Sequence, residues 1–277
     1  MTAAVDTRPA VSVAELQRAW RAVQLGQFRR TVQGDNPATQ LPRGRSEPSW
    51  TPSGEERVLP VVRCASAYGA TTFALALATA TDTGARVVEC SSATTSGLAA
   101  ASTAELGAHS SGWVQGSRGE VLLQRTGVAL QSVHDVPSPM RAEKSTLTVL
   151  DVGWELGQVL NTPSWLAAQL RQAAAVIVVT CATVPGLRHL EGALALLHIT
   201  RTVVAVVGPP RKRWPKPVQH SAGSLTRAAD HGGRLVVIPW DRRLAVAGLD
   251  STPLPEALLD AAAAVLERVD LRTDGSR

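Results

Sequence analysis

One pattern constrains the fold of this chain more than any other. From residue 57 onward, short and almost continuously apolar runs alternate with segments of helical periodicity. Strands with this composition are buried on both faces, which is typical of a parallel sheet covered by helices on either side. We therefore expect a doubly wound, mostly parallel sheet in a three-layer α/β arrangement. The expected strands lie at 58–66, 85–92, 146–153, 174–183, 202–208 and 234–240.

The expected helices fill the intervals between these strands. Their apolar residues recur at helical spacing rather than in continuous runs. Shorter strand-like runs, EVLLQ and VALQSV, lie within 119–133. The predicted helices lie at 71–81, 96–106, 164–172, 184–197 and 255–269.

The first 56 residues differ from the rest of the chain. Between 33 and 56, Pro, Gly, Ser and charged residues dominate, which is typical of a flexible linker. Before this stretch, Ser12 and Glu15 have the spacing of a capping box, which predicts a helix over 13–30. We expect 1–56 to be an amphipathic helix plus linker, and 57–277 to be one α/β domain.

The predicted N-terminal helix has an apolar stripe of Val13, Leu16, Trp20 and Val23. Such a stripe needs a surface to bury against. The body of this protein, another protein and a membrane surface are the three alternatives, and the sequence leaves all of them open.

Composition limits the location of the protein. No run of about 18 apolar residues predicts a membrane span. The three cysteines are far apart, as in proteins of a reducing compartment, so we expect a cytoplasmic protein. The net charge of +5 comes almost entirely from arginine. Frequent Arg and Ala suggest a GC-rich genome, plausibly actinobacterial, and codon bias of this kind weakens the charge as evidence for nucleic-acid binding.

A strand–turn–helix occupies the place where parallel sheets bind phosphate. The first strand ends in Cys64-Ala-Ser-Ala-Tyr-Gly-Ala-Thr-Thr72, and a helix follows. This segment resembles the deviant Walker A motif of MinD/ParA-type P-loop ATPases, K-G-G-x-G-K-[ST]-[ST]. Gly69 and the pair Thr71-Thr72 fix the register. In that register, Ala65 replaces the signature lysine and Ala70 replaces the lysine that grips phosphate.

Two further departures lie in the same loop, where Ser66 and Ala67 replace two glycines of the motif. The resemblance implies an ATP and Mg²⁺ site, which uses backbone amides, a lysine and a hydroxyl. Here the vestige of that site would comprise Gly69, Ala70, Thr71, Thr72 and Asp151. Because both lysines are replaced, we expect no catalytic residues, no firmly bound cofactor and no metal. Asp151 is then the one acidic switch residue retained.

Other segments resemble the same family in the same order. The run Leu150–Gly153 fits the family's segment of D-x-x-G or similar pattern, and 237–247 matches I-P-x-D-x-x-[LV]-x-x-A. The family's carboxylate after its second strand is matched only by Glu89, which we expect inside the strand. The strand at 203–208 ends in Gly208, where the family has a base-reading asparagine. The resemblance covers 58 to about 269 and implies a P-loop fold.

The segment 209–217 is a feature of this chain alone. It combines four cations, one tryptophan and four prolines. Prolines favour an extended, stiff loop, and Arg with Trp is a mixture common in interfaces. We expect Arg211, Arg213 and Trp214 to contact a partner. The alternatives are a solvated connector, and a Trp214 that folds back onto the edge of the sheet.

These observations predict a catalytically degenerate MinD/ParA-like protein, a pseudo-ATPase. Its expected role is a scaffold or localisation factor in a partitioning, septum-placement, pilus or conjugation-type machine. A protein partner is expected, and a homodimer and a nucleic-acid partner remain open. The alternatives are a weak nucleotide-binding ATPase with a non-standard P-loop, and a DNA-binding accessory protein that uses the 209–217 loop.

Overall fold

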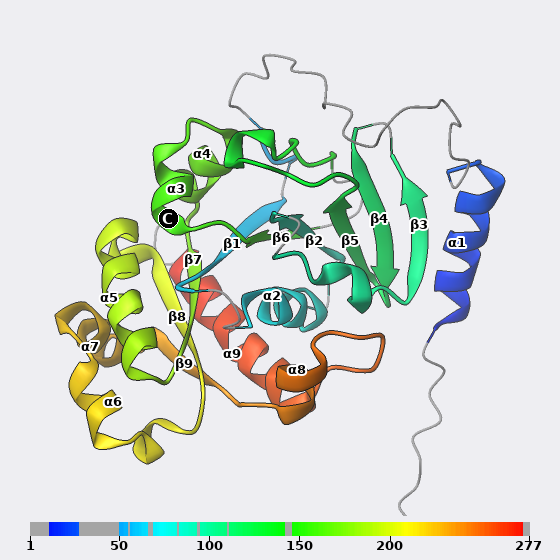
Figure 1. Ribbon diagram of the computed structural model, residues 1–277. Coiled ribbons are helices and arrows are strands. Elements are labelled where there is room, and N and C mark those ends of the chain that lie inside the picture. Colours follow the sequence, from blue (N-terminus) through cyan, green and yellow to red (C-terminus); the bar gives the residue numbers. More distant parts are fainter. Residues whose placement is uncertain are drawn as a thin grey trace, which may run out of the picture.

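A single sheet with a parallel centre organises the chain (Figure 1). The computed structural model describes residues 11–27, 50–54, 56–65, 69–81, 83–92, 95–109, 111–141 and 146–273. Within these ranges nine strands form the sheet in the order β3-β4-β5-β2-β6-β1-β7-β8-β9. Strands β5 to β9 in this order run parallel, and only β3 and β4 introduce antiparallel pairs. The predicted doubly wound α/β sheet is confirmed.

Except for β3 and β4, which lie where no strand was predicted, the strands begin and end close to their predicted positions. They are β1 (Arg57–Arg63), β2 (Ala85–Cys90), β3 (Ala104–Ala108), β4 (Trp113–Arg118), β5 (Val121–Thr126), β6 (Leu147–Val152), β7 (Val176–Cys181), β8 (Thr202–Val207) and β9 (Leu235–Ile238).

The α-helices cover both faces of the sheet. They are α1 (Val13–Gln24), α2 (Ala70–Thr79), α3 (Leu156–Asn161), α4 (Trp165–Gln172), α5 (Val184–Leu197), α6 (Lys216–Ser221), α7 (Ser224–His231), α8 (Arg242–Ala247) and α9 (Glu256–Thr273). Short 3₁₀ turns are η1 (Leu98–Ala101), η2 (Val133–Asp135), η3 (Ile199–Arg201) and η4 (Arg211–Arg213). Among the described residues, none of these helices has the length and apolarity to cross a membrane.

Each central strand sends alternate side chains into two separate cores. In β1, Leu59 and Val61 join the core beneath α2 and α9, whereas Val62 joins the core beneath α4 and α5. Pro60 is tolerated in this central strand. The backbone N–H groups of even-numbered β1 residues point toward β7, and the pairing of β1 with β7 begins only at Val61↔Ile177. The N–H that proline lacks therefore has no ladder position to fill.

One predicted helix is wrong. The segment 96–106 forms η1 and the start of β3, which continues through β4 and β5 as an antiparallel meander. Glycines allow the chain to reverse here: Gly112 and Gly119 have φ of 88° and 56°, values that favour glycine. The predicted run VALQSV is also not a strand.

The N-terminal helix is shorter than predicted. Helix α1 ends at Gln24, and Gly26 follows with φ of 72°, which turns the chain out of the helix. The expected end of the helix, Arg29 and Arg30, lies outside the described residues. The same holds for 33–49 of the predicted linker. The flexible linker therefore stays a prediction for 33–49.

The described end of the predicted linker packs on the body. Trp50 lies edge-on to Trp165, with ring centroids 5.6 Å apart. The carboxylate of Glu56 pairs with Arg86 at 2.5 Å, and their side chains are 2% and 1% exposed. Burial acts to raise the pKa of Glu56, but hydrogen bonds from Thr148 and from the amide of Ser53, together with the charge of Arg86, lower it below its usual value. The described end of this stretch therefore contacts the body, and the domain boundary at 56/57 stays a prediction.

We predict that Glu56→Ala lowers the free energy of unfolding by about 3–5 kcal/mol, because it leaves the Arg86 charge buried without its partner. Urea unfolding measures this. The matched control is Glu105→Ala, which breaks the more exposed pair with Arg125 and should cost less than about 1 kcal/mol. Similar losses in the two variants would show that the Glu56–Arg86 pair does not anchor this segment.

Candidate functional site

A pocket of 360 Å³ lies at the C-terminal ends of β1, β8 and β9, against the N-terminus of α2. Ligands of open parallel sheets bind at this edge. Residues that line the pocket include Arg63, Gly69, Thr71, Val207, Trp240 and Leu249. The structure therefore brings the predicted phosphate-loop residues into a real concavity.

Helix α2 begins as the sequence predicts. Gly69 is its N-cap, with φ of 78°, and its carbonyl accepts a hydrogen bond from the Phe73 amide at 2.9 Å. A left-handed backbone at this position favours glycine. Thr71 and Thr72 follow in the first turn and line the pocket. Ser66 and Ala67 of the predicted loop lie outside the described residues.

Ala70 occupies the position that the resemblance gives to the phosphate-gripping lysine. Its side chain is 5% exposed and packs in the core with Phe73 and Ala74. A methyl group here offers no charge to an anion. The first turn of α2 contains no basic residue that substitutes for the missing amine.

Asp151 lies near the end of β6, opposite Glu89 of β2 in the parallel register, and is 1% exposed. The Thr71 hydroxyl lies close enough to its carboxylate to lower the carboxyl pKa. Among the described residues, its Oδ2 atom has no hydrogen-bond partner. Burial, with a smaller effect of the Glu89 charge, raises the pKa of Asp151 to about 7, although Thr71 and Arg63 act to lower it.

Glu89 lies inside β2, as predicted, and has a structural role. One carboxylate oxygen accepts hydrogen bonds from the amides of Gly97 and Leu98 at 2.8 and 2.9 Å. The other accepts a hydrogen bond from the Ser96 hydroxyl at 2.8 Å. These bonds hold the start of η1. Because its lone pairs are largely occupied, Glu89 is poorly placed to act on a ligand.

Arg63 is the site residue that sequence reasoning missed. It is the last residue of β1, and its guanidinium donates to the Gly153 carbonyl and faces Asp151. Burial lowers the pKa of Arg63, and the Asp151 charge partly offsets this. The signal in the sequence was a single cation at the end of an otherwise apolar strand.

Gly208 stands where the resemblance places a base-reading asparagine. A Cβ atom at this position would lie 2.6 Å from the Cβ of Ala182, closer than real Cβ contacts. The strand end therefore cannot accept an asparagine without moving its neighbour. Packing against Ala182 therefore leaves no room for a larger side chain at the position where the resemblance implies base recognition.

The residues of this pocket do not fit a hydrolysing Mg²⁺–ATP site. Thr71 lines the pocket, and Asp151 lies behind it without lining the pocket; both offer oxygen ligands of the kind that Mg²⁺ prefers. A triphosphate, however, would meet Arg63 as the one cation among the described residues that line the pocket, and that guanidinium is engaged by Gly153 and Asp151. Without more positive charge, the negative charge of a triphosphate is left unbalanced.

The segment 209–217 is folded rather than extended, which corrects the sequence-based expectation. It forms η4 and the start of α6. Trp214 is 3% exposed within the core beneath α5, and its indole N–H donates to the Pro209 carbonyl at 2.9 Å. The guanidinium of Arg211 lies 5.0 Å from the centre of the Trp214 ring and pairs with Asp230 at 2.8 Å.

The expectation that Trp214 packs little is therefore wrong, and the alternative of a tryptophan folded back onto the body describes its position. Of the three residues predicted to contact a partner, Arg213 is exposed, together with its neighbour Lys212. The partner-binding role of these residues stays a prediction, and Arg213 is the member of the set that offers a surface for it.

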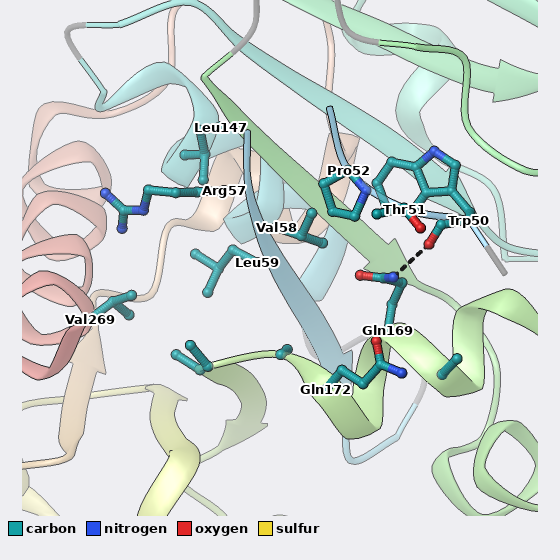
Figure 2. Close-up of a pocket in the computed structure, with 14 residues that line it drawn as sticks. Trp50, Thr51, Pro52, Arg57, Val58, Leu59, Leu147, Gln169, Gln172 and Val269 are labelled. Atoms are coloured by element: carbon teal, nitrogen blue, oxygen red, sulfur yellow. Dashed lines mark hydrogen bonds between the residues drawn. The ribbon is translucent and has the colours of Figure 1, made fainter. Parts of the chain in front are cut away.

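A second cavity, of 440 Å³, lies at the opposite edge of the sheet, where β1 and β6 begin (Figure 2). Val58, Leu59, Leu147 and Val269 contribute apolar walls. Two of its polar groups already have partners: the Gln169 amide donates to the Trp50 carbonyl at 2.8 Å, and Arg57 pairs with Asp270. We assign no ligand to this cavity.

Comparison with known proteins finds similar solved structures but no match in sequence. No family and no curated protein matches the sequence. A plasmid partition protein from Borrelia burgdorferi bound to AMPPNP is similar in structure, with 11% identity, a TM-score of 0.48 and coverage of 79% of this chain and 99% of that one.

Two further solved structures show the same level of similarity. The cell division ATPase MinD from Pyrococcus furiosus has 13% identity and a TM-score of 0.46, covering 78% of this chain and 99% of that one. McdA from Cyanothece, in its apo form, has 10% identity and a TM-score of 0.47, covering 76% and 99%. At these identities the likeness concerns the α/β fold alone.

We predict that Asp151→Asn removes a stability change with pH. Burial raises the pKa of this carboxyl to about 7 in the folded protein, above its ordinary value of 3.8, so the folded state holds this proton more tightly. The stabilisation is present at low pH and is lost as pH rises through 7. From pH 5 to 8, the wild type should lose about 2–3 kcal/mol relative to Asp151→Asn in urea unfolding. Parallel pH profiles would contradict this account of Asp151.

We predict that Trp214→Ala destabilises the protein by about 3–5 kcal/mol, because it removes a buried indole from the core. The control is Trp240→Ala, whose ring is 62% exposed and whose loss should change stability by no more than about 0.5 kcal/mol. Chemical unfolding followed by circular dichroism separates the two. A Trp214→Ala variant as stable as the wild type would contradict the buried, stabilising role of this tryptophan.

Proposed function

We propose that this chain is a catalytically degenerate protein of the MinD/ParA fold that acts as a scaffold or localisation factor. One observation carries the proposal: buried Ala70 occupies the position of the phosphate-gripping lysine, within a pocket that is otherwise formed as in a phosphate-binding fold. The fold has kept its concavity while the groups that stabilise transferred phosphate are absent from the described part of it.

The magnitude of this loss supports a protein that does not hydrolyse ATP. Phosphoryl transfer depends on positioning and on cations that stabilise charge in the transition state. Removal of one such preorganised contact typically costs about 3–4 kcal/mol of transition-state stabilisation. Two lysines of the motif are alanines here, Ala65 and Ala70. Their combined loss is enough to reduce hydrolysis to a background rate.

A scaffold needs surfaces rather than a reaction centre, and the chain offers two that are exposed. Helix α1 presents its apolar stripe to solvent. The turn η4 presents Lys212 and Arg213 beside Lys216, on a loop anchored by the buried Trp214. The machines proposed are those of partitioning, septum placement, pili or conjugation, as the resemblance implies.

The position of Arg63 favours a second candidate, a weak nucleotide-binding protein. Its guanidinium is partly buried, lines the pocket and lies near Thr71 at the helix N-terminus. A cation there attracts an anion if it is released from Gly153. Equilibrium binding of a fluorescent ATP analogue, with Arg63→Ala as the comparison, separates this candidate from a scaffold. Binding that disappears in Arg63→Ala would favour the second candidate.

We predict negligible ATP hydrolysis by the purified protein. The physical reason is the absence of both motif lysines. A coupled phosphate-release assay at millimolar Mg²⁺–ATP provides the measurement, with Asp151→Asn and the exposed control Asp260→Asn alongside. Turnover on the order of 1 per second that is lost in Asp151→Asn and kept in Asp260→Asn would refute the proposal.

A further inference from the structure

Helix α1 attaches to the body through its polar side. The Glu15 carboxylate is 2% exposed and accepts the Thr103 hydroxyl and the Gly119 amide. Arg18 donates to the Gly119 carbonyl at 2.6 Å. These bonds fix the helix beside β3, the edge strand of the sheet, where it forms the outer flank of the molecule (Figure 1). The Ser12–Glu15 capping box also holds its first turn.

The opposite side of α1 is an exposed apolar stripe. Val13, Leu16, Trp20 and Val23 are 72%, 58%, 63% and 53% exposed. Scattered apolar residues on a surface are ordinary. Four of them on one side of a 12-residue helix form a continuous line with no cover from the described part of the chain. Of the three alternatives for this stripe, burial against the body is not seen in the described part of the chain.

The spacing of the stripe identifies the kind of surface that fits it. Steps of three, four and three residues place Val13 and Trp20 at a positions, and Leu16 and Val23 at d positions, of a heptad. At 100° per residue, the stripe covers an arc of about 80°. That arc is narrower than the apolar face of about 100° or more that buries in a core, and it suits a helical partner better than a lipid surface.

The flanks of the stripe favour an identical partner. Positions beside the seam are occupied by Ser12, Gln17, Ala19 and Gln24, none of which is charged. Helices that select a different partner commonly use complementary charges at these positions. Uncharged flanks let two copies of the same helix meet without repulsion.

We propose that α1 pairs with α1 of a second copy of this chain in an antiparallel arrangement. Antiparallel packing sets a positions against d positions, so Val13 meets the partner's Val23 and Leu16 meets the partner's Trp20. Valine pairs then lie at both ends, and each of the two central layers pairs Leu16 with Trp20, so no layer contains two tryptophans. Parallel packing would stack Trp20 on the partner's Trp20. Antiparallel helix dipoles also attract one another.

Two heptads are few, so the dimer should be weak. A 12-residue helix spans about 18 Å, and its seam buries much less than a standard interface. Dissociation constants in the tens to hundreds of micromolar are therefore expected. The pairing uses a flank remote from the pocket beside α2, so it should not depend on nucleotide.

Sedimentation equilibrium on the full chain without nucleotide is the first test. The mass of the wild type should rise from 29.1 kDa toward twice that value as concentration rises to several hundred micromolar. Leu16→Glu should weaken association at least tenfold. The control is Leu196→Glu, at a leucine of α5 that is 52% exposed, and it should associate like the wild type. Circular dichroism verifies that both variants fold.

Cysteine crosslinking tests the direction of the pairing. The double variant Val13→Cys/Val23→Cys should form covalent dimers under mild oxidation, whereas Val13→Cys alone should form few. The wild type, whose Cys90 is buried and whose Cys64 and Cys181 are partly buried, controls for native thiols. Rapid dimer formation by Val13→Cys alone would overturn the antiparallel arrangement.

Three outcomes overturn the proposal. The first is a wild type that stays monomeric at several hundred micromolar. The second is a dimer that resists Leu16→Glu. The third is a monomeric protein that co-floats with phosphatidylglycerol vesicles and loses this binding in Leu16→Glu, which would assign the stripe to a membrane surface instead.

Discussion

Burial of the central strands on both faces is the constraint on which the rest of this structure depends. Strands β6, β1, β7 and β8 send side chains alternately into two cores, so polar groups have room mainly at the strand ends. The exceptions inside the sheet have local partners, as Arg86 does in Glu56. At the C-terminal edge, the same rule sets Arg63 against Asp151 and places both beside the first turn of α2.

That edge has the shape of a phosphate site and a different chemistry. Ala70 extends the core into the position that a phosphate-binding lysine would occupy, and Gly208 is held to glycine by Ala182. Thr71 faces the buried carboxylate of Asp151. At Ala70 and Gly208, where the resemblance implies groups that act on a ligand, the chain has residues that pack internally, in keeping with the proposed scaffold role.

Sequence periodicity was sufficient to predict the parallel sheet, because burial on both faces leaves continuous apolar runs in β7 and β8. It failed where the outcome depends on contacts distant in sequence. The β3–β5 meander depends on glycine turns. Periodicity did not reveal these turns, and a helix was predicted over 96–106, where η1 and the start of β3 lie. Trp214 looked like a partner contact because only the fold shows the core that receives it. The pocket residues Gly69 and Thr71 were located by motif, whereas Arg63 required the register of β1 against β6.

The most direct test of the central claim is the melting temperature of the protein with and without millimolar Mg²⁺–ATP. A ligand that binds only the folded state stabilises it in proportion to the logarithm of its concentration over the dissociation constant. Because the described pocket lacks the cations that a triphosphate requires, we predict no measurable shift. A rise of several degrees that is abolished in Arg63→Ala would show a functional nucleotide site and contradict the account.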